Sequence, residues 1–239
     1  AWDVAGRVGA PARAPARLRA PPRATTSPST PRMPLGTDGT LTLETPAGPL
    51  PLHEYRLRLA GREWSVVHTG SVLGFWDEQR FLSEARDRVP YGLTLWPSAI
   101  ALAHEIAARA DAWRDVRVLE LGAGTGLPGI VAASFGARVR QTDRQALALD
   151  VCRHNGARNR PRDGSPLAIA YAEADWTLWD DATRYDVILG ADVLYSEPMQ
   201  PHLRRIFEGS LAPAGRLLLA DPFRKTSFPL LEAMAADGW

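Results

Sequence analysis

The sequence predicts an α/β fold with a doubly wound, mostly parallel sheet and an N-terminal β-strand extension. Three patterns lead to this prediction. From residue 116 onward, short apolar runs alternate with segments of helical periodicity, which is typical of a sheet covered by helices on both faces. One apolar run ends in a glycine-rich turn that leads into a helix. Before residue 96, apolar and polar residues alternate between Pro and Gly breaks, as in short antiparallel strands. Right-handed crossovers make the parallel part Rossmann-like.

Residues 1–40 form an Ala-, Arg- and Pro-rich segment that we expect to be disordered. Residues 1–32 contain six arginines, one acidic residue and few large apolar side chains, so burial cannot offset the entropy of ordering them. The sequence does not begin with Met, and Met33 stands where the composition changes, so a natural start at Met33 is a hypothesis. A basic arm for nucleic acid or membrane is the alternative, but no aromatic residues are interleaved with these arginines.

Residues 41–95 are expected to form a β-hairpin and helix extension, because their apolar residues alternate with polar ones and Ala60-Gly61 suits a turn. The predicted elements are strands at 41–45, 52–59 and 62–67 and a helix at 75–88.

Residues 96–239 are expected to form the main domain. Pro97 suits the first turn of a helix, and apolar residues follow it at helical spacing as far as Ala110. The later elements are expected in the order strand 116–121, helix 127–135, strand 138–142, helix 145–155, strands 167–172 and 185–189, helix 201–207, strand 216–220 and helix 228–235.

Composition narrows the class of protein. Of the 239 residues, 45% are apolar and 23% are charged, an ordinary globular balance. The net charge of +1 gives no reason to expect nucleic-acid binding, and no run of 18 apolar residues predicts a membrane span. Cys152 is the single cysteine of the sequence and the histidines lack ligand spacing, so we expect neither a disulfide nor a metal site. We therefore expect a monomer in the reducing cytoplasm.

The glycine-rich turn is the strongest functional signal. An apolar strand runs through Glu120 into Gly122, Gly124 and Gly126, and a helix follows. Glycine allows a tight turn and the close approach of a ligand to the backbone. The dinucleotide fingerprint would need glycine at 127, where the chain has Leu127, so the spacing disfavours a nicotinamide dehydrogenase. The carboxylate of Glu120 can approach a positively charged ammonium group, whereas a negatively charged pyrophosphate would gain little from it. A plain strand-to-helix turn is the alternative interpretation.

Acidic residues follow the next strands along the chain. Asp143 ends the second strand, where a carboxylate can accept hydrogen bonds from both ribose hydroxyls. Asp175-Trp176 follows the third strand, where the carboxylate can accept from an adenine amino group and the indole can lie along the purine. Asp192 and Tyr195 follow the fourth strand at the mouth of the crevice. The alternative for Asp143 is helix capping, and the alternative for Asp175-Trp176 is a loop Asp beside a core Trp. For Asp192 and Tyr195 the alternative is an exposed turn.

Together these motifs resemble the class I S-adenosylmethionine-dependent methyltransferases, and within them methyltransferase family sixteen, whose members are mostly protein-lysine methyltransferases. In that family the acidic residue and glycines hold the amino acid part of the cofactor, the second-strand acid holds the ribose, Asp-Trp lies at the adenine and Asp-x-x-Tyr faces the acceptor. The resemblance therefore assigns cofactor binding to Glu120, Gly122, Gly124, Gly126, Asp143, Asp175 and Trp176, and catalytic acceptor positioning to Asp192 and Tyr195. The segment 91–97 resembles the approach to the family's first helix, so Trp96 is expected to line the cofactor site.

The resemblance implies methylation of a lysine nitrogen in a protein substrate, with S-adenosylmethionine as cofactor. A small-molecule N-methyltransferase and a non-catalytic S-adenosylmethionine-binding protein are the alternatives. Asp221-Pro-Phe-Arg224 also resembles the branch containing the lysine methyltransferase of the electron-transfer-flavoprotein β subunit. The family's sheet normally ends with two further strands after the helix that reaches Ala236, so we expect C-terminal strands to be missing from this sequence. We therefore expect the main domain to be a truncated one.

Overall fold

The structure, a computed structural model, describes residues 41–45, 49–70, 91–161 and 164–239. The predicted disordered segment 1–40 and the predicted helix 75–88 lie outside the described residues. Within the described part of the chain, no helix is long and apolar enough to span a bilayer.

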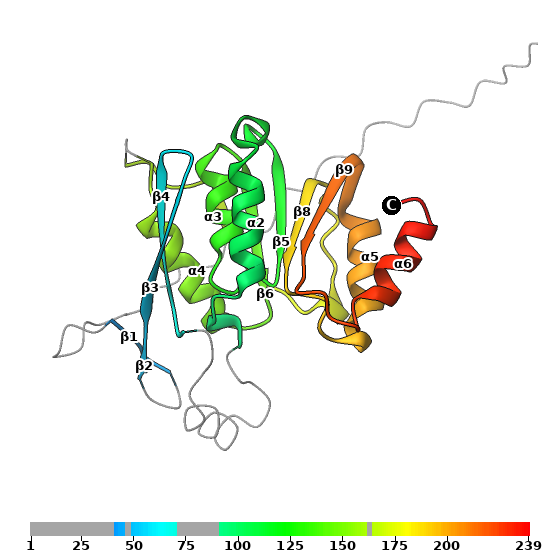
Figure 1. The fold of residues 1–239 in the computed structure, drawn as a ribbon, viewed down its shortest axis with the longest axis horizontal. Helices are drawn as coiled ribbons and strands as arrows, with labels where there is room; N and C mark the ends of the chain where they lie inside the picture. The colour runs from blue at the N-terminus through cyan, green and yellow to red at the C-terminus, as the bar shows by residue number, and fades with distance from the viewer. Residues whose placement is uncertain (1–40, 46–48, 71–90, 162–163) are drawn as a thin grey trace, which may run out of the picture.

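The centre of the protein is a parallel sheet of five strands in the order β7-β6-β5-β8-β9 (Figure 1). Its strands are β5 (Arg117–Leu121), β6 (Arg138–Asp143), β7 (Ile169–Glu173), β8 (Tyr185–Ala191) and β9 (Leu211–Ala220). The chain runs outward from β5 through β6 to β7 and then returns to pair β8 with the other side of β5. The strand order therefore reverses at β5, and in open α/β sheets ligands bind beyond the carboxyl ends of the strands at such a point.

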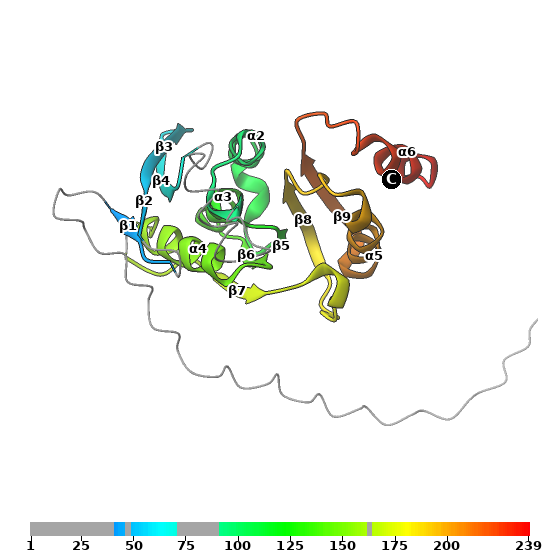
Figure 2. The same ribbon diagram turned by 90° about the horizontal axis from the view of Figure 1, so that it is seen from below.

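Helices cover both faces of this sheet, which confirms the predicted doubly wound architecture (Figure 2). One face carries α2 (Pro97–Ala107), α3 (Leu127–Ser134) and α4 (Ala146–Arg158), and the other carries α5 (Gln200–Ser210) and α6 (Phe228–Ala236). Short 3-10 turns form η1 (Tyr91–Leu93), η2 (Ala110–Trp113), η3 (Trp176–Leu178) and η4 (Glu197–Met199). Pro97 stands in the first turn of α2, where its missing N–H leaves no hydrogen bond unmade.

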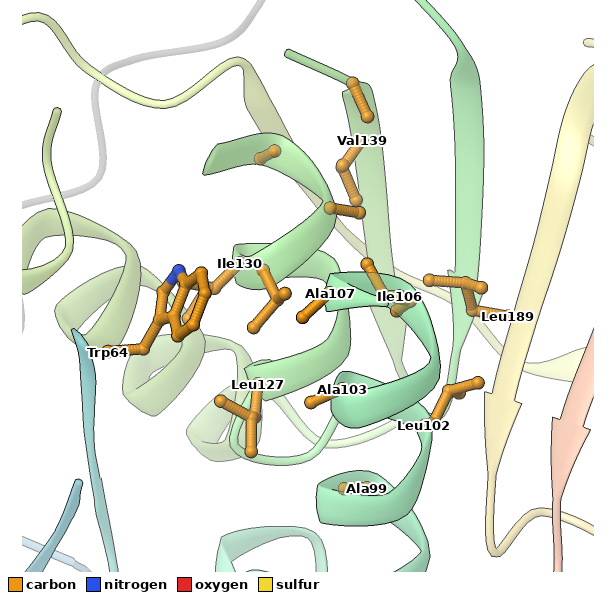
Figure 3. Close-up of a cluster of buried hydrophobic side chains, with 14 of the residues drawn as sticks. Trp64, Ala99, Leu102, Ala103, Ile106, Ala107, Leu127, Ile130, Val139 and Leu189 are labelled. Atoms are coloured by element: carbon orange, nitrogen blue, oxygen red, sulfur yellow. The ribbon is translucent and has the colours of Figure 1, made fainter. Parts of the chain in front are cut away.

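Alternation along the strands divides the apolar core between the two faces. Val118 in β5 and Leu189 in β8 point to the side of α2 and α3, whereas Leu119 and Ile188 point to the side of α5 and α6. Figure 3 shows how α2 and α3 meet over the sheet through small and branched side chains. The labelled residues of this layer are Trp64, Ala99, Leu102, Ala103, Ile106, Ala107, Leu127, Ile130, Val139 and Leu189.

Two antiparallel strand pairs precede the main sheet; the alternation predicted three of these strands, and β2 was missed. They are β1 (Thr42–Leu43) with β2 (Leu50–Pro51), and β3 (His53–Leu59) with β4 (Arg62–His68). Ala60 and Gly61 both have left-handed φ values, 50° and 72°, as the turn of a two-residue hairpin requires. The Trp64 indole donates to Ser134 Oγ at 3.0 Å and packs into the core, so the hairpin is joined to α3. The division of the chain into separate domains stays a prediction.

Some element boundaries differ from those predicted. β9 begins at Leu211, five residues before the predicted start at Arg216, because its pairing with β8 shifts register between Tyr185 and Val187. This irregularity accommodates Pro213, which a regular strand interior disfavours. α4 continues to Arg158, beyond the predicted end at residue 155.

Candidate functional site

The loop after β5 carries its three glycines in left-handed backbone conformations. The φ values of Gly122, Gly124 and Gly126 are 61°, 55° and 80°. A Cβ atom on Gly124 would lie 3.0 Å from the carbonyl oxygen of Gly92, which leaves no room for a side chain. Glycine is therefore required here both by backbone conformation and by close packing. Gly126 then caps the start of α3, so backbone N–H groups of the loop lie at the carboxyl end of the central strand.

Glu120 lies beneath this loop. Its Oε2 accepts hydrogen bonds from the Gly129 backbone N–H at 3.1 Å and from Gln141 Nε2 at 2.7 Å. The same Gln141 nitrogen donates to the Gly126 carbonyl oxygen at 2.8 Å. Burial raises the pKa of Glu120 to about 8, although these donors oppose the shift. Glu120 thus supports the loop from below, a role that sequence reasoning missed. Its predicted contact with the cofactor's ammonium group stays a prediction.

Gln141 was also missed by sequence reasoning. It is fully buried in β6 and shares a strand face with Val139. An amide at a position where alternation expects an apolar residue is the signal that could have identified it.

Asp143 joins the end of β6 to the glycine loop. Its Oδ2 accepts a hydrogen bond from the Gly124 N–H at 3.0 Å, and its Oδ1 accepts one from the Gln145 N–H at 2.9 Å. The residue is 8% exposed, and burial raises its pKa while the backbone donors offset part of that effect. A Cβ atom on Gly92 would lie 3.7 Å from Asp143 Oδ2, so η1 packs against the same carboxylate. The structure therefore brings together two predicted cofactor ligands, Asp143 and Gly124.

Trp96 is connected to this region through η1. Its indole Nε1 donates to the Tyr91 carbonyl oxygen at 3.1 Å, next to the Gly92 that packs on Gly124. This contact fixes the side chain of Trp96 beside η1. Its predicted contact with the cofactor stays a prediction.

Trp176 also lies at the glycine loop. A Cβ atom on Gly122 would be 3.5 Å from the six-membered ring of Trp176 and 3.1 Å from Val193 Cγ1. The segments that follow β5, β7 and β8 therefore meet at Gly122. The neighbouring Asp175 caps η3, since its Oδ1 accepts from Thr177 Oγ1 at 2.7 Å and from the Thr177 N–H at 2.9 Å. The Thr177 hydrogen bonds lower the pKa of Asp175.

Asp192 and Tyr195 lie beyond the end of β8. Asp192 has a left-handed φ of 58°, its N–H donates to the Ala220 carbonyl oxygen at 2.8 Å, and its side chain is only 6% exposed. Arg224 Nη1 donates to Asp192 Oδ1, a contact that sequence reasoning did not anticipate. Tyr195 is 59% exposed. Partial desolvation raises the pKa of Tyr195 and the charge of Asp143 adds to the effect, so both lie in one electrostatic environment.

Two residues of α4 support the loop from its other side. Asn155 Nδ2 donates to the Thr125 carbonyl oxygen at 2.9 Å, and Cys152 Sγ donates to the Gly124 carbonyl oxygen at 2.9 Å. Burial raises the pKa of the Cys152 thiol, which keeps its proton available for that hydrogen bond. Sequence reasoning placed Asn155 at a helix end, and no local pattern marks its contact with the loop.

The arrangement suits an adenosine-containing ligand with a charged amino acid part. Backbone groups and a carboxylate converge at the carboxyl edge of the sheet, next to an indole ring. In the described part of the chain, no three His, Cys, Asp or Glu side chains are placed to hold a metal ion.

Comparison with known proteins agrees with this geometry. The protein N-lysine methyltransferase METTL21A of Xenopus tropicalis is 36% identical over 131 residues, which cover 54% of this chain and 60% of that protein. The EEF1A lysine methyltransferase 3 of Mus musculus is 32% identical over 139 residues, covering 57% of this chain and 58% of that protein. The chain thus spans about 60% of the length of the curated relatives it matches.

Among solved structures, the 16S rRNA N2 G1207 methyltransferase RsmC of T. Thermophilus, in complex with AdoMet and guanosine, aligns with a TM-score of 0.51 and 20% identity. That alignment covers 76% of this chain and 45% of the other, and it shows a shared methyltransferase fold. The sequence model of one family, described as lysine methyltransferase, matches residues 78–227. Since this match covers more than half of the 239 residues, the chain belongs to the lysine methyltransferase family.

Proposed function

We propose that this protein binds S-adenosylmethionine beyond the carboxyl ends of β5 and β6 and transfers its methyl group to a lysine nitrogen of a protein substrate. The observation that carries the proposal is the hydrogen bond from the Gly124 N–H to Asp143 Oδ2 at 3.0 Å. It joins the glycine loop to a carboxylate at the point where the strand order reverses.

The residues at this edge of the sheet fit the chemistry of this cofactor. The loop residues Gly122, Gly124 and Gly126 have no side chains, so a ligand's amino acid part can approach their backbone without meeting a Cβ atom. Asp143 has lone pairs beyond those that accept from Gly124 and Gln145, so ribose hydroxyls can donate to them. The Trp176 ring offers a flat apolar surface for adenine. S-adenosylmethionine supplies an electrophilic methyl group when it is bound.

The protein's own contribution to the reaction is placement of the acceptor. A lysine nitrogen must be neutral to attack, because its lone pair forms the new bond to carbon while the departing electron pair goes to sulfur. Asp192 can accept a hydrogen bond from this amine and orient it, while Tyr195 shapes the mouth of the site. Holding reactants near attack distance can contribute roughly 7–11 kcal/mol in enzymes. Asp192 therefore acts as an acceptor-positioning group.

A protein acceptor is favoured over a small amine by the openness of the site's mouth. Tyr195 and Phe223 are 59% and 82% exposed, and they follow β8 and β9 at the same edge of the sheet as Asp192. Small-molecule sites usually enclose most of their ligand, whereas exposed aromatic residues are common in protein contacts. The relatives named as protein-lysine methyltransferases support the same choice.

The test uses labelled S-adenosylmethionine and a cell lysate. We expect label in a protein band, and mass spectrometry of that band should place the label on lysine. Label only in the small-molecule fraction would favour a small-molecule N-methyltransferase.

Calorimetry should show binding of S-adenosylmethionine and none of NAD. The Asp192→Ala variant should lose transfer while its cofactor affinity stays within a few-fold of the unaltered protein. A non-catalytic cofactor-binding protein would bind S-adenosylmethionine equally well but would transfer no label to protein or to small molecules.

We also propose that the protein is a cytoplasmic monomer that does not act on nucleic acid. The proposal is supported by a net charge of +1 and by one buried, unpaired cysteine. Light scattering after size exclusion and cell fractionation test the two parts separately.

A further inference from the structure

Arg224 lies between two carboxylates at the carboxyl ends of β8 and β9. Its Nη1 contacts Asp192 Oδ1 and lies 3.8 Å from Asp221 Oδ2. Its backbone N–H donates to Asp221 Oδ1 at 2.9 Å. Phe223 has a left-handed φ of 60°, which turns the chain so that Arg224 folds back over Asp221. The guanidinium therefore joins the loop after β9 to the predicted acceptor residue after β8.

The charges in this cluster are poorly hydrated. The side chains of Asp192 and Asp221 are 6% and 10% exposed, and that of Arg224 is 32% exposed. Asp221 Oδ2 is buried without a hydrogen-bond partner in the described structure. Water and salt screen buried pairs weakly, so the guanidinium offsets much of the negative charge on Asp192.

Among the described residues, other charged groups also act at this edge of the sheet. Asp143 and Arg144, at the end of β6, act with opposite signs on Tyr195. Lys225 follows Arg224 directly in the chain. In the part of the protein that the structure describes, Arg224 is the cation in contact with Asp192.

This pairing addresses a chemical problem in the proposed function. An unopposed carboxylate beside a lysine nitrogen favours the ammonium form, which has no lone pair with which to attack. We propose that Arg224 is a positioning residue that fixes Asp192 Oδ1 and offsets its charge, so that Asp192 receives the acceptor as a neutral amine. The inference rests on the proposed function, because it concerns the acceptor of that reaction. Arg224 itself acts through Asp192 and does not touch the reacting atoms.

A binding experiment tests the charge on Asp192 without methyl transfer. The probe is n-butylammonium chloride, followed by backbone NMR shifts near Asp192 at pH 7.5, with n-butanol as the neutral control. We expect the Arg224→Gln variant to bind the ammonium about tenfold more tightly than the unaltered protein, and we expect the additional substitution Asp192→Asn to remove this gain. Arg224→Lys keeps the charge and should stay within a few-fold of the unaltered protein.

A matched control removes a different ion pair. Arg117 Nη2 pairs with Asp186 Oδ1 at 2.8 Å at the opposite end of the sheet. Arg117→Gln should leave n-butylammonium binding unchanged. If Arg224→Gln binds the probe no more tightly than Arg117→Gln does, the inference is wrong. Melting temperatures of all variants identify any that fail to fold. If Arg224→Gln fails to fold, n-butylammonium binding is compared between Arg224→Lys and the unaltered protein.

The kinetic experiment measures methyl transfer to the labelled lysate protein as a function of pH. For Arg224→Gln we expect kcat to fall about tenfold at pH 7.5, with recovery at about pH 9–10 and no increase in the KM for the acceptor, because a larger share of the acceptor is protonated near neutrality. Arg224→Lys should keep the pH profile of the unaltered protein. A purely structural role predicts the same loss at every pH or a raised KM, and either result overturns the inference.

The two proposals fail in different ways. Transfer by the unaltered protein, combined with an unchanged pH profile and unchanged probe binding in Arg224→Gln, would remove the role of Arg224 and leave the proposed function standing. If the unaltered protein methylates no amine, the proposed function fails, and the n-butylammonium titration alone decides whether Arg224 offsets the charge on Asp192.

Discussion

Asn155 pairs with the backbone of Val67 as a neighbouring strand would. Its Oδ1 accepts from the Val67 N–H at 2.8 Å, and its Nδ2 donates to the Val67 carbonyl oxygen at 3.1 Å. The same Nδ2 donates to the Thr125 carbonyl oxygen in the glycine loop at 2.9 Å. One side chain on α4 therefore connects the N-terminal hairpin to the candidate cofactor site.

We predict that Asn155→Ala destabilises the protein by about 3 kcal/mol, because it leaves buried backbone groups of Val67 and Thr125 without partners. It should also weaken S-adenosylmethionine binding through the loop. Asn159→Ala is the matched control, since Asn159 pairs with Ser65 in the same way but its side chain bonds to Ser65 and the Asn155 backbone rather than to the loop. Urea unfolding and calorimetry measure the two effects. Equal cofactor affinity in both variants would show that the hairpin and the loop are not coupled through Asn155.

The glycine loop gives a second prediction, for Gly124→Ala. The new Cβ would lie 3.0 Å from the Gly92 carbonyl oxygen at a φ of 55°, so we expect a loss of about 1–3 kcal/mol in the free energy of unfolding and weaker cofactor binding.

Gly209→Ala in α5 is the control for this substitution. Nothing lies within 4 Å of its Cβ position, so helix propensity should stabilise the protein by about 0.5–1 kcal/mol. Thermal unfolding of the two variants should therefore shift in opposite directions. Shifts in the same direction would mean that the loop tolerates a side chain.

Local sequence was sufficient for the parts of the fold that depend on neighbours along the chain. The spacing of apolar residues predicts the five parallel strands and their helices. The glycine loop is predicted where the spacing typical of a strand gives way to that of a helix. Asp143 could be placed at the site because carboxyl ends of adjacent parallel strands share one edge of the sheet. Residues directly after strands were thus predictable from sequence.

Contacts between distant loops were not predictable in this way. Asp192 and Arg224 are 32 positions apart, and their pairing depends on the register of β8 with β9 and on two left-handed residues, Asp192 and Phe223. The contact of Glu120 with Gln141 depends on the pairing of β5 with β6, which places the two side chains opposite each other. The boundary of β9 was missed because its irregular pairing follows from tertiary packing.

Asp143 provides a test of the cofactor site. If ribose hydroxyls donate to its carboxylate, Asp143→Asn should weaken S-adenosylmethionine binding by about 100-fold, because hydrogen bonds to a charged group contribute about 1.5–3 kcal/mol each. Burial raises the pKa of Asp143, so affinity in the unaltered protein should fall as the pH drops through that raised value and the carboxylate gains a proton. The asparagine variant has no such proton, and its affinity should be flat over the same range. Calorimetry at several pH values measures both, and a parallel pH dependence in the two proteins would assign the effect to another group.

Glu120 gives a prediction about stability and pH. Its pKa is about 8 in the folded protein against an ordinary value of 4.5, so the folded state binds more protons than the unfolded state between these values. The free energy of unfolding should therefore decrease as the pH rises from about 5 to 8. Glu120→Gln keeps an oxygen that can accept from Gly129 and Gln141 and has no proton to lose. The free energy of unfolding of the Glu120→Gln variant, relative to that of the unaltered protein, should therefore increase by at least about 1 kcal/mol between pH 5 and 8. The difference should then level off above pH 8.

The measurement is urea unfolding at half-unit pH steps, with Asp186→Asn as control. The Asp186 carboxylate is bonded to Arg117, which lowers its pKa, so its contribution is lost only at acid pH as that carboxylate becomes protonated. Between pH 5 and 8 the control should therefore change stability by a constant amount, whereas Glu120→Gln should diverge from the unaltered protein. A constant difference for Glu120→Gln would mean that Glu120 is already ionised when folded. It would then lie beneath the glycine loop as an anion, with its negative charge available to the ammonium group of the cofactor.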